Sequence, residues 1–321
     1  RNIAIDSCWF TAPVQMLNQT NPLLIRITNY SDEAVENVRL ALQHQGQEKP
    51  VGTLNIPAGA TVIDTANITL LQTGWHEAKL TLTDYPITFD DHYFFTFYVP
   101  EKIEVLVINE ASPDKYLQAA FAGASVFQVT HTPSLNIDYA SLPDYELIIA
   151  HDLQSLSSGL ASELTQYVQN GGNLLVFPGE KAERESFNQF LKELPAPELA
   201  SLKQNTQKVA YINTDEFVFR DVFENEGANL KLPAAAAHFP LTAGNFRLGE
   251  PILRFRDGGT YMGKYNRDKG HLYLCAAPLD PQYNDLVRNA EIFVPMLYKM
   301  AISTGTEREI AYFIGKDNNL R

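Results

Sequence analysis

The sequence predicts two domains, an all-β sandwich followed by an α/β domain with a largely parallel sheet. The chain has 321 residues, and single hydrophobic cores seldom grow beyond about 250–300 residues. Residues 1–100 hold short segments in which apolar and polar residues alternate, which is the period of half-buried strands. Beyond Pro100-Glu101-Lys102, continuous apolar runs alternate with segments of helical period, as is typical of βαβ units.

The first domain, residues 1–100, is expected to be an immunoglobulin-like β-sandwich of six or seven strands. Turn residues separate the strands about every 8–12 residues, the spacing that such sandwiches show. Asn21-Pro22 is expected to form a turn before one strand, and Gly46 and Pro50 are expected to break the chain after another. The expected strands are residues 23–27, 38–42, 51–56, 61–71, 75–82 and 93–99.

The second domain is expected to begin with alternating strands and helices. Its first helix is predicted at residues 113–122, with Ser112 as the N-cap and Pro113 in the first position. A second helix covers residues 157–169 and ends at Gly171-Gly172. The expected strands are residues 103–108, 126–129, 145–150 and 173–177.

The end of the second domain, which spans residues 101–306, has a different pattern. Strand-like pieces and turns fill residues 229–264, another strand follows at 270–277, and a helix at 290–302 closes the domain. Residues 307–321 are expected to form a C-terminal strand and tail, which either ends this domain or begins a further one.

The composition argues against several classes of function. The 25 basic and 38 acidic residues give a net charge of −13, so nucleic acid is not an expected partner, because phosphates attract basic surfaces. No apolar run reaches the length of a membrane span, so this fragment itself is not expected to insert into a membrane. Cys8 and Cys275 lack CxxC partners, so no metal site is expected. They are interpreted as buried thiols, with a disulfide between them as the alternative.

Candidate ligand-binding residues are those that follow the expected strands, because open parallel sheets bind ligands at the carboxyl ends of their strands. His151-Asp152 is the most suggestive pair, since an imidazole beside a carboxylate can act as a general base. The alternative is that Asp152 starts or caps the loop before the next helix. No residue is assigned a catalytic role, and the candidate set is Glu110, His131, His151, Asp152 and Glu180.

Three other motifs are interpreted as structural. Asp90-Asp91-His92 supplies too few oxygen ligands for calcium and is expected to be a turn. The glycine pairs at residues 171–172 and 258–259 lack the context of a nucleotide-binding loop, so no cofactor is expected. Residues 180–185 are expected to be the solvated face of a helix.

The helix ending in Val168-Gln169-Asn170-Gly171-Gly172 and the strand Asn173-Leu174-Leu175-Val176-Phe177-Pro178-Gly179 resemble the class I glutamine amidotransferase-like fold, a flavodoxin-like, three-layer α/β architecture. Working members of that family carry a catalytic Cys in the sharp turn after this strand, whereas the turn here reads Pro178-Gly179-Glu180. The later His-x-Glu pair and the glycine-rich oxyanion loop are also missing, at residues 276–280 and 151–154. Glutaminase chemistry is therefore not expected.

Five further segments, at residues 89–95, 100–103, 270–279, 284–287 and 293–297, resemble the large BatA-domain membrane proteins of Bacteroidetes. This resemblance covers nearly the whole chain. It implies membrane anchors outside this sequence, a periplasmic location for these domains, and protein partners in the cell envelope. No catalytic residue is established for that group, so the resemblance transfers none.

Two functions remain open at this point. The first is a non-catalytic interaction or scaffold module of the cell envelope, because a sheet of enzyme-like topology lacks acid, base and nucleophile in the expected places and is fused to an adhesion-type sandwich. The alternative is a small-molecule or carbohydrate binder, or a diverged hydrolase, that uses His131, His151, Asp152 and Glu180 at the sheet edge. The alternative predicts that these side chains converge around a pocket.

Overall fold

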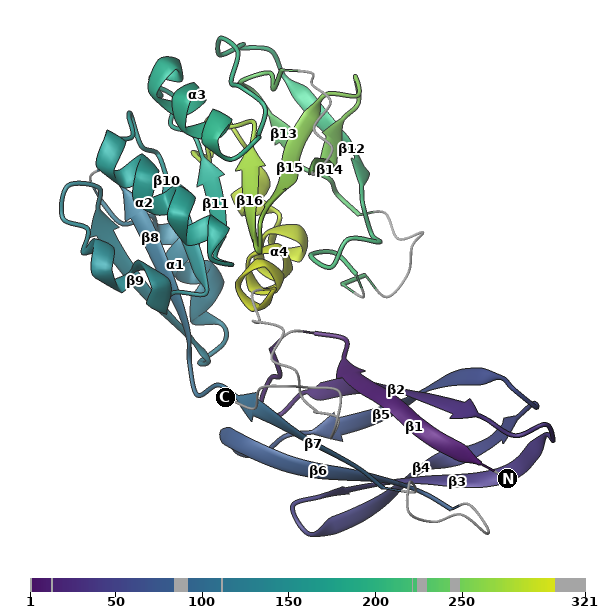
Figure 1. The fold of residues 1–321 in the computed structure, drawn as a ribbon. Coiled ribbons are helices and arrows are strands. Elements are labelled where there is room, and N and C mark those ends of the chain that lie inside the picture. The colour runs from purple at the N-terminus through teal and green to yellow at the C-terminus, as the bar shows by residue number, and fades with distance from the viewer. Residues whose placement is uncertain are drawn as a thin grey trace. The chain divides into compact units, whose positions relative to one another are not determined.

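The computed structural model describes residues 2–12, 14–83, 92–110, 112–220, 222–223, 230–242 and 249–303. The chain divides into two compact units, Arg1–Glu101 and Lys102–Thr304. Over the described residues most of the regular structure is β-sheet, and the four α-helices all belong to the second unit (Figure 1). The expected tail at residues 307–321 and the Asp90-Asp91 part of the expected turn lie outside the described residues.

The first unit contains two antiparallel sheets that share one hydrophobic core (Figure 1). Alternate residues of the strands are buried, such as Leu23, Ile25 and Ile27 of β2, so the predicted period of two is confirmed. In the first sheet the order β1-β2-β5 joins β1 (Ile3–Phe10), β2 (Thr20–Asn29) and β5 (Thr61–Thr69). In the second sheet the order β4-β3-β6-β7 joins β3 (Val35–His44), β4 (Gln47–Ile56), β6 (Gly74–Leu82) and β7 (His92–Val99).

Three details of the first unit differ from the sequence prediction. The predicted strands do not include β1, because its pairing shifts register between Ile5 and Ser7 and the bulge breaks the alternation. Asn21-Pro22, predicted as a turn, lies inside β2. Pro50, predicted to break the chain, lies inside β4. This is possible because β4 is an edge strand, and its pairing with β3 shifts register beside Pro50.

The second unit is built on a nine-stranded sheet with the order β13-β12-β14-β15-β16-β11-β10-β8-β9. The strands from β16 to β9 are parallel, as the sequence predicts, and antiparallel strands extend the sheet beyond β16. The parallel strands are β8 (Ile103–Asn109), β9 (Phe127–Pro133), β10 (Leu147–His151), β11 (Asn173–Phe177) and β16 (Gly270–Cys275). The antiparallel strands are β12 (Gln207–Ile212), β13 (Ala234–Ala235), β14 (Gly249–Phe255) and β15 (Thr260–Arg267).

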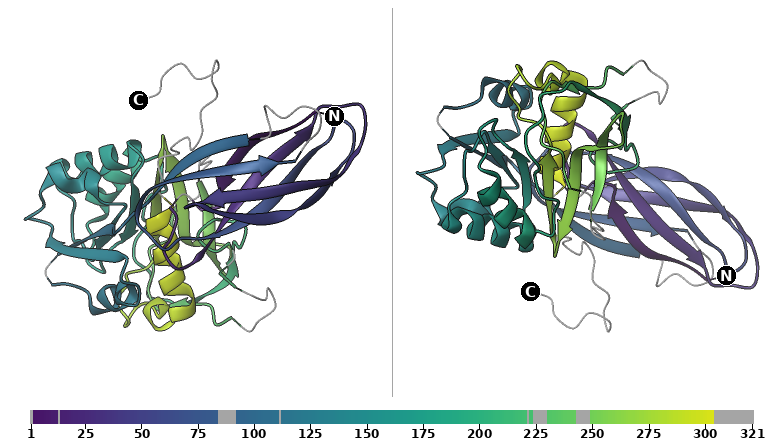
Figure 2. Two further views of the ribbon diagram at one scale, coloured as in Figure 1. Left: turned by 90° about the horizontal axis from the view of Figure 1, so that it is seen from below. Right: turned by 90° about the horizontal axis from the view of Figure 1, so that it is seen from above.

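The helices of the second unit pack against the parallel strands. They are α1 (Lys115–Ala122), α2 (Ser158–Gln169), α3 (Arg184–Glu193) and α4 (Ala290–Ile302). Side chains of α2 and α3 share a core with alternate residues of β8, β10, β11 and β16, whereas α1 packs against α4. Figure 2 shows α4 on the other side of the sheet from α2 and α3. Central strands such as β10 and β11 are buried along their whole length, which explains their continuous apolar sequences.

Two predictions about the helices are wrong in detail. The N-cap of α1 is Asp114 rather than Ser112, because the Asp114 side chain accepts hydrogen bonds from the amides of Tyr116 and Leu117. The helix therefore begins two residues later than predicted. Of residues 180–185, predicted as a helix face, only the last two belong to α3. The sequence prediction thus covers only the first two residues of α3, and it omits β12.

Candidate functional site

Four carboxylates follow the carboxyl ends of four neighbouring parallel strands. Glu110 follows β8, Asp152 follows β10, Glu180 lies in the turn after β11, and Asp280 lies in the loop after β16. Burial raises the pKa of Asp152, the ring of His151 opposes this, and the charges of Asp280, Glu110 and Glu180 raise it further. The charges of Glu110, Glu180 and Asp280 therefore reach Asp152, so three of the five predicted residues belong to one group, to which the structure adds Asp280.

Asp152 lies at the centre of this carboxylate group. Its φ of 55° is in the left-handed region, which Asp adopts more readily than most residues. Its amide donates to the carbonyl of Phe177 at 3.2 Å and so ties the end of β10 to the end of β11. A Cβ atom on Gly179 would lie 2.8 Å from Oδ1 of Asp152, so the carboxylate covers Gly179. Asp152 begins the loop after β10, whereas Ser157 caps α2.

The two predicted histidines belong to a second polar group, beside the first turn of α1. The sheet register pairs His151 with Asn109, and His131 with Val107, so His151, Asn109 and His131 share one face of the sheet. Nε2 of His151 lies 3.5 Å from Oδ2 of Asp114, the N-cap of α1. The two side chains of this pair are only 11% and 16% exposed.

Several buried atoms of this second group have no hydrogen-bond partner. These atoms are Nδ1 and Nε2 of His131, Nδ1 of His151 and Oδ1 of Asn109. Native proteins pair the great majority of buried polar atoms with protein groups or ordered water, and an unpaired one costs about 1–3 kcal/mol. So many unpaired atoms in one group indicate a place where water or a ligand completes the hydrogen bonding.

Electrostatics favour an ionised Asp114 and a neutral His131 near neutral pH. Burial lowers the pKa of His131, Asp114 acts against this, and His151 adds to it. Burial raises the pKa of Asp114, but His151 and the amides of the first helical turn outweigh burial, so this pKa lies below its ordinary value. An ionised Asp114 therefore stands beside a neutral His131.

The side chains of the two groups mainly offer hydrogen-bond acceptors. His151 has a carboxylate partner of the kind that orients the imidazole in acyl-transfer enzymes, but no hydroxyl or thiol of the described residues is hydrogen-bonded to its ring. Nor does the described part of the chain place three or more His, Cys, Asp or Glu side chains where they could hold a metal ion. Carboxylates, an amide and neutral imidazole together suit a ligand that is rich in hydrogen-bond donors.

Sequence reasoning misses two members of the site, Asp114 and Asp280. Asp114 is missed because Ser112-Pro113 is the usual pattern of an N-cap and first helical residue, although Asp is as good a cap as Ser. Asp280 comes after a fourth parallel strand, β16, and this position is a signal that the sequence offers. The signal is indirect, because β16 ends at Cys275 and a loop separates that end from Asp280.

The rest of the second unit offers a different kind of surface. A groove of about 880 Å³ lies along α2 and α3, and none of the five predicted residues lines it.

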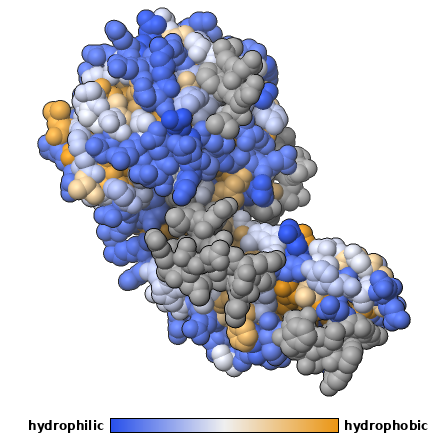
Figure 3. All heavy atoms as spheres, in the orientation of Figure 1, coloured by the Kyte–Doolittle hydropathy of each residue, from blue (hydrophilic) through white to orange (hydrophobic). Residues whose placement is uncertain are grey.

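The face of the second unit seen in Figure 3 is mainly hydrophilic, in keeping with the net charge of −13. None of the described helices is both long and apolar enough to cross a membrane.

Comparisons with known proteins show no family. No protein-family model and no curated protein matches the chain. Among solved structures, a putative ThuA-like protein from Bacteroides uniformis aligns with 66% of this chain and 96% of its own, at 13% identity and a TM-score of 0.47. A CARDB domain from Pyrococcus furiosus, solved with di-metal ions, aligns with 30% of this chain and 92% of its own, at 14% identity and a TM-score of 0.28.

A β-galactosidase from Rahnella sp. R3 is similar over 63% of this chain, at 15% identity and a TM-score of 0.43. This chain spans about a third of that enzyme, 32% of its length. With identities and TM-scores as low as these, the three likenesses carry no argument about function, because one fold hosts many activities.

Proposed function

We propose that the second domain binds a small polyhydroxylated ligand, such as a carbohydrate, at the carboxyl ends of β8, β10 and β11, and that it catalyses no reaction there. One observation carries this proposal: the carboxylate of Asp152, on which the charges of Glu110, Glu180 and Asp280 act, stands at the same strand ends as a buried group of unpaired polar atoms. Ionised carboxylates can only accept hydrogen bonds, so the hydroxyl groups of a ligand match them.

Further features favour a neutral polyhydroxylated ligand over a cation. Asn109 and the neutral ring of His131 offer hydrogen-bonding atoms without charge. Tyr283 borders the carboxylates, since a hydrogen bond to Glu180 raises the pKa of its hydroxyl. An aromatic ring combines an apolar face with a polar tip, which suits the apolar and polar sides of a sugar ring.

The finer fold assignments are part of the same proposal. The parallel strands and the helices on either side of them support a three-layer α/β domain of the glutamine amidotransferase-like kind. In the first unit, the orders β1-β2-β5 and β4-β3-β6-β7 support an immunoglobulin-like sandwich. Relative to the constant-domain arrangement, the fourth strand has moved from the first sheet to the second.

The cellular setting is proposed from the sequence alone. The resemblance to BatA-domain membrane proteins favours an interaction module at the periplasmic face of the membrane, with protein partners in the cell envelope and anchors outside this sequence. Affinity purification of the full-length protein from solubilised membranes tests this setting. Recovery from the cytosolic fraction, with no envelope protein bound, would refute it.

Thermal unfolding of the whole chain tests the ligand. Far-ultraviolet circular dichroism follows the second unit, because the described α-helices all lie there. A ligand at about 100 times its Kd stabilises a protein by about 2.7 kcal/mol, which raises the Tm of a unit of this size by about 5–10 °C. A panel of mono- and oligosaccharides is compared with diamines at equal ionic strength. Stabilisation by diamines alone, or by no compound, contradicts the proposal.

Two variants locate the site. Asp152→Asn removes the carboxylate at the centre of the group, so we expect it to abolish the stabilisation by the active sugar. Glu48→Gln removes an equivalent charge from an exposed position on β4, and we expect the full stabilisation to remain. If Asp152→Asn responds like the wild type, the ligand binds elsewhere.

A further inference from the structure

A second candidate site lies in the first unit, at the turn between β3 and β4. Gln45 and Gly46 form this turn with φ values of 51° and 75°, and His44 pairs with Gln47 across it. Two central residues with positive φ are typical of a type I′ hairpin turn, whose twist matches that of the strands. The turn therefore fixes the position of His44 at the end of β3.

His44 begins a chain of hydrogen bonds whose direction can be worked out. Nε2 of His76 lies 2.9 Å from the carbonyl oxygen of Gln72, which can only accept, so this nitrogen donates. Nδ1 of a neutral His76 then accepts, and it lies 2.8 Å from Nε2 of His44. Nε2 of His44 therefore donates, which leaves Nδ1 of a neutral His44 without a proton. His76 stacks on Phe97, with ring centroids 5.1 Å apart, and this contact holds the chain in place.

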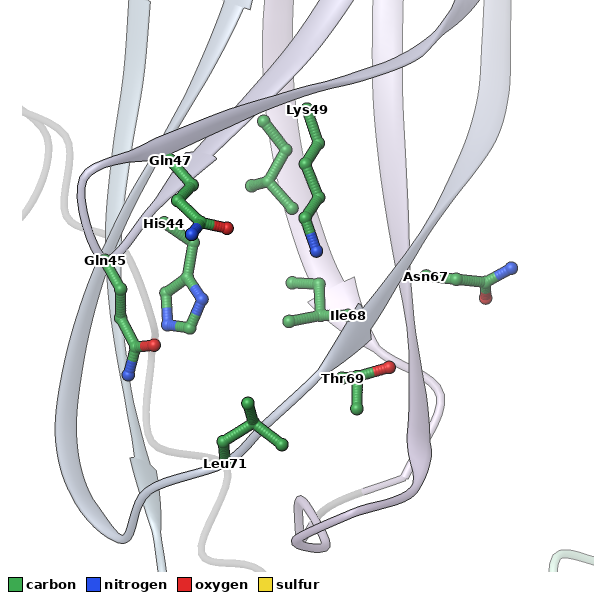
Figure 4. A pocket seen from close by; sticks show the side chains of 9 residues that line it. His44, Gln45, Gln47, Lys49, Asn67, Ile68, Thr69 and Leu71 are labelled. Atoms are coloured by element: carbon green, nitrogen blue, oxygen red, sulfur yellow. The ribbon is translucent and has the colours of Figure 1, made fainter.

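The free nitrogen of His44 faces a pocket. Figure 4 shows one ring nitrogen of His44 on the side where Lys49 and Ile68 lie, and this nitrogen is Nδ1 because Nε2 is bonded to His76. The pocket has a volume of about 150 Å³ and lies between the ends of β3 and β4 on one side and β5 on the other. A cavity of about this volume holds a molecule the size of benzene.

Lys49 gives the pocket a positive charge. It is the only charged residue among the described residues that line the pocket, and no described carboxylate lies within salt-bridge distance of its ammonium. Leu42 and Ile68 add apolar surface. The lining therefore matches a small molecule with one negative charge and a short apolar part.

We propose that this pocket binds the anion of a small carboxylic acid, held by the ammonium of Lys49 and by the protonated Nδ1 of His44. Protonation at Nδ1 leaves the hydrogen bonds to His76 and Gln72 unchanged, because those bonds do not use Nδ1 of His44. The pocket then offers two charged donors to one carboxylate, and charge-assisted hydrogen bonds are stronger than neutral ones. In neutral His44, the lone pair of Nδ1 faces the carboxylate and repels it.

Binding in this pocket is coupled to pH. Burial lowers the pKa of His44, and His76 on β6 and Lys49 on β4 lower it further. Phe97 on β7, whose ring lies 5.9 Å from that of His44, and Ile68 on β5, which lines the same pocket, carry no charge. A carboxylate bound between Lys49 and His44 stabilises the protonated ring, so it raises this pKa. By linkage, the anion binds more tightly as the pH falls.

Titration of the whole nitrogen-15-labelled chain with sodium acetate tests the proposal, with the imidazole nitrogens followed by NMR. We expect acetate to shift Nδ1 of His44 to saturation and to bind about tenfold more tightly at about pH 5.5 than at about pH 8. Acetamide has nearly the same shape and no charge, so we expect no shift at equal concentration. A blocked peptide with a single Asp distinguishes a free acid from an acidic side chain as the source of the carboxylate.

Variants separate the pocket from general effects of charge. Lys49→Gln changes an exposed side chain and leaves the bond between His44 and His76 intact, so we expect loss of the acetate response in a folded protein. Lys79→Gln, on β6 and outside the pocket lining, is the matched control and should respond like the wild type. His44→Gln assigns the signal. An equal response to acetamide, an affinity that does not change with pH, or an unchanged response in Lys49→Gln would each overturn the proposal.

Discussion

Replacement of Asp114 tests how the start of α1 organises the site. Oδ1 of Asp114 accepts hydrogen bonds from the amides of Tyr116 and Leu117, both at 2.8 Å, and Oδ2 faces His151. Loss of such an N-cap in Asp114→Ala costs about 1 kcal/mol, which lowers the Tm of a unit of this size by about 2–4 °C. Asp114→Asn keeps a side chain that caps equally well and loses only the charge opposite His151, so we expect a smaller fall.

The difference between the wild type and Asp114→Asn should depend on pH. The pKa of Asp114 is lower in the folded chain than its ordinary value, because His151 and the helix amides outweigh burial. A carboxyl group whose folded pKa is depressed adds stability above its unfolded pKa, which is about 3.9 for Asp. This stability is lost as the pH falls through the folded pKa. The Tm difference should therefore be complete near neutral pH and shrink in acid.

Two optical signals and one control make the assay specific. Far-ultraviolet circular dichroism follows the helices of the second unit, while the fluorescence of Trp9 and Trp75 follows the first unit and should not change. Ser112→Ala is the matched control, because Ser112 is the cap that the sequence pattern predicts and it is exposed. If Ser112→Ala lowers the Tm as much as Asp114→Ala does, or if Asp114→Ala leaves the helical transition unchanged, the reasoning is wrong.

Two further predictions concern packing and thiol reactivity. Gly270→Ala should destabilise the second unit by more than about 3 kcal/mol, because a Cβ would lie 2.1 Å from the carbonyl oxygen of Val168. Gly159→Ala, whose nearest neighbour would be 3.7 Å away, should stabilise α2 by about 0.5–1 kcal/mol, and urea unfolding measures both. Cys8 and Cys275 are both buried and free. This agrees with their interpretation as two buried thiols. Burial raises both pKa values to about 12, so rapid labelling of the folded chain near neutral pH would contradict this structure.

Much of the fold could be predicted from the sequence, and the misses have local causes. The strands β8, β10 and β11 are continuous apolar runs that only burial on both sides explains, and each was placed within two residues. In β1 the bulge at Ile5/Ser7 removes the period on which such a prediction depends. Phe187, Phe190 and Leu191 of α3 have helical spacing and are buried, so their pattern could have been found. The N-cap residue of this helix, Glu183, makes no capping hydrogen bond with its side chain. The sequence therefore lacks the usual pattern that marks the start of a helix.

The candidate site was harder to predict than the fold, because its composition depends on strand register. The sequence suggests that His151 and Asp152 act together. In the structure the ring of His151 contacts Asp114. The pKa of Asp152 responds both to His151 and to Glu110 and the other carboxylates. His131 was expected after the end of its strand and lies inside β9. His131 shares a face with His151 because of the register in which β9 pairs with β8. The register between two strands cannot be worked out from a single sequence.

The turn after β11 leaves little space for a side chain at Gly179. Gly179 lies where the resembled family carries its nucleophile turn, and a Cβ there would lie 2.8 Å from Oδ1 and 3.1 Å from the backbone oxygen of Asp152. Gly179→Cys should therefore destabilise the second unit and fail to hydrolyse glutamine. Asp152→Gly in the same chain removes the side-chain conflict and leaves the backbone one, so only part of the stability should return. Wild-type stability or measurable glutaminase activity in Gly179→Cys would show that the space is open and that the missing Cys alone separates this site from that chemistry.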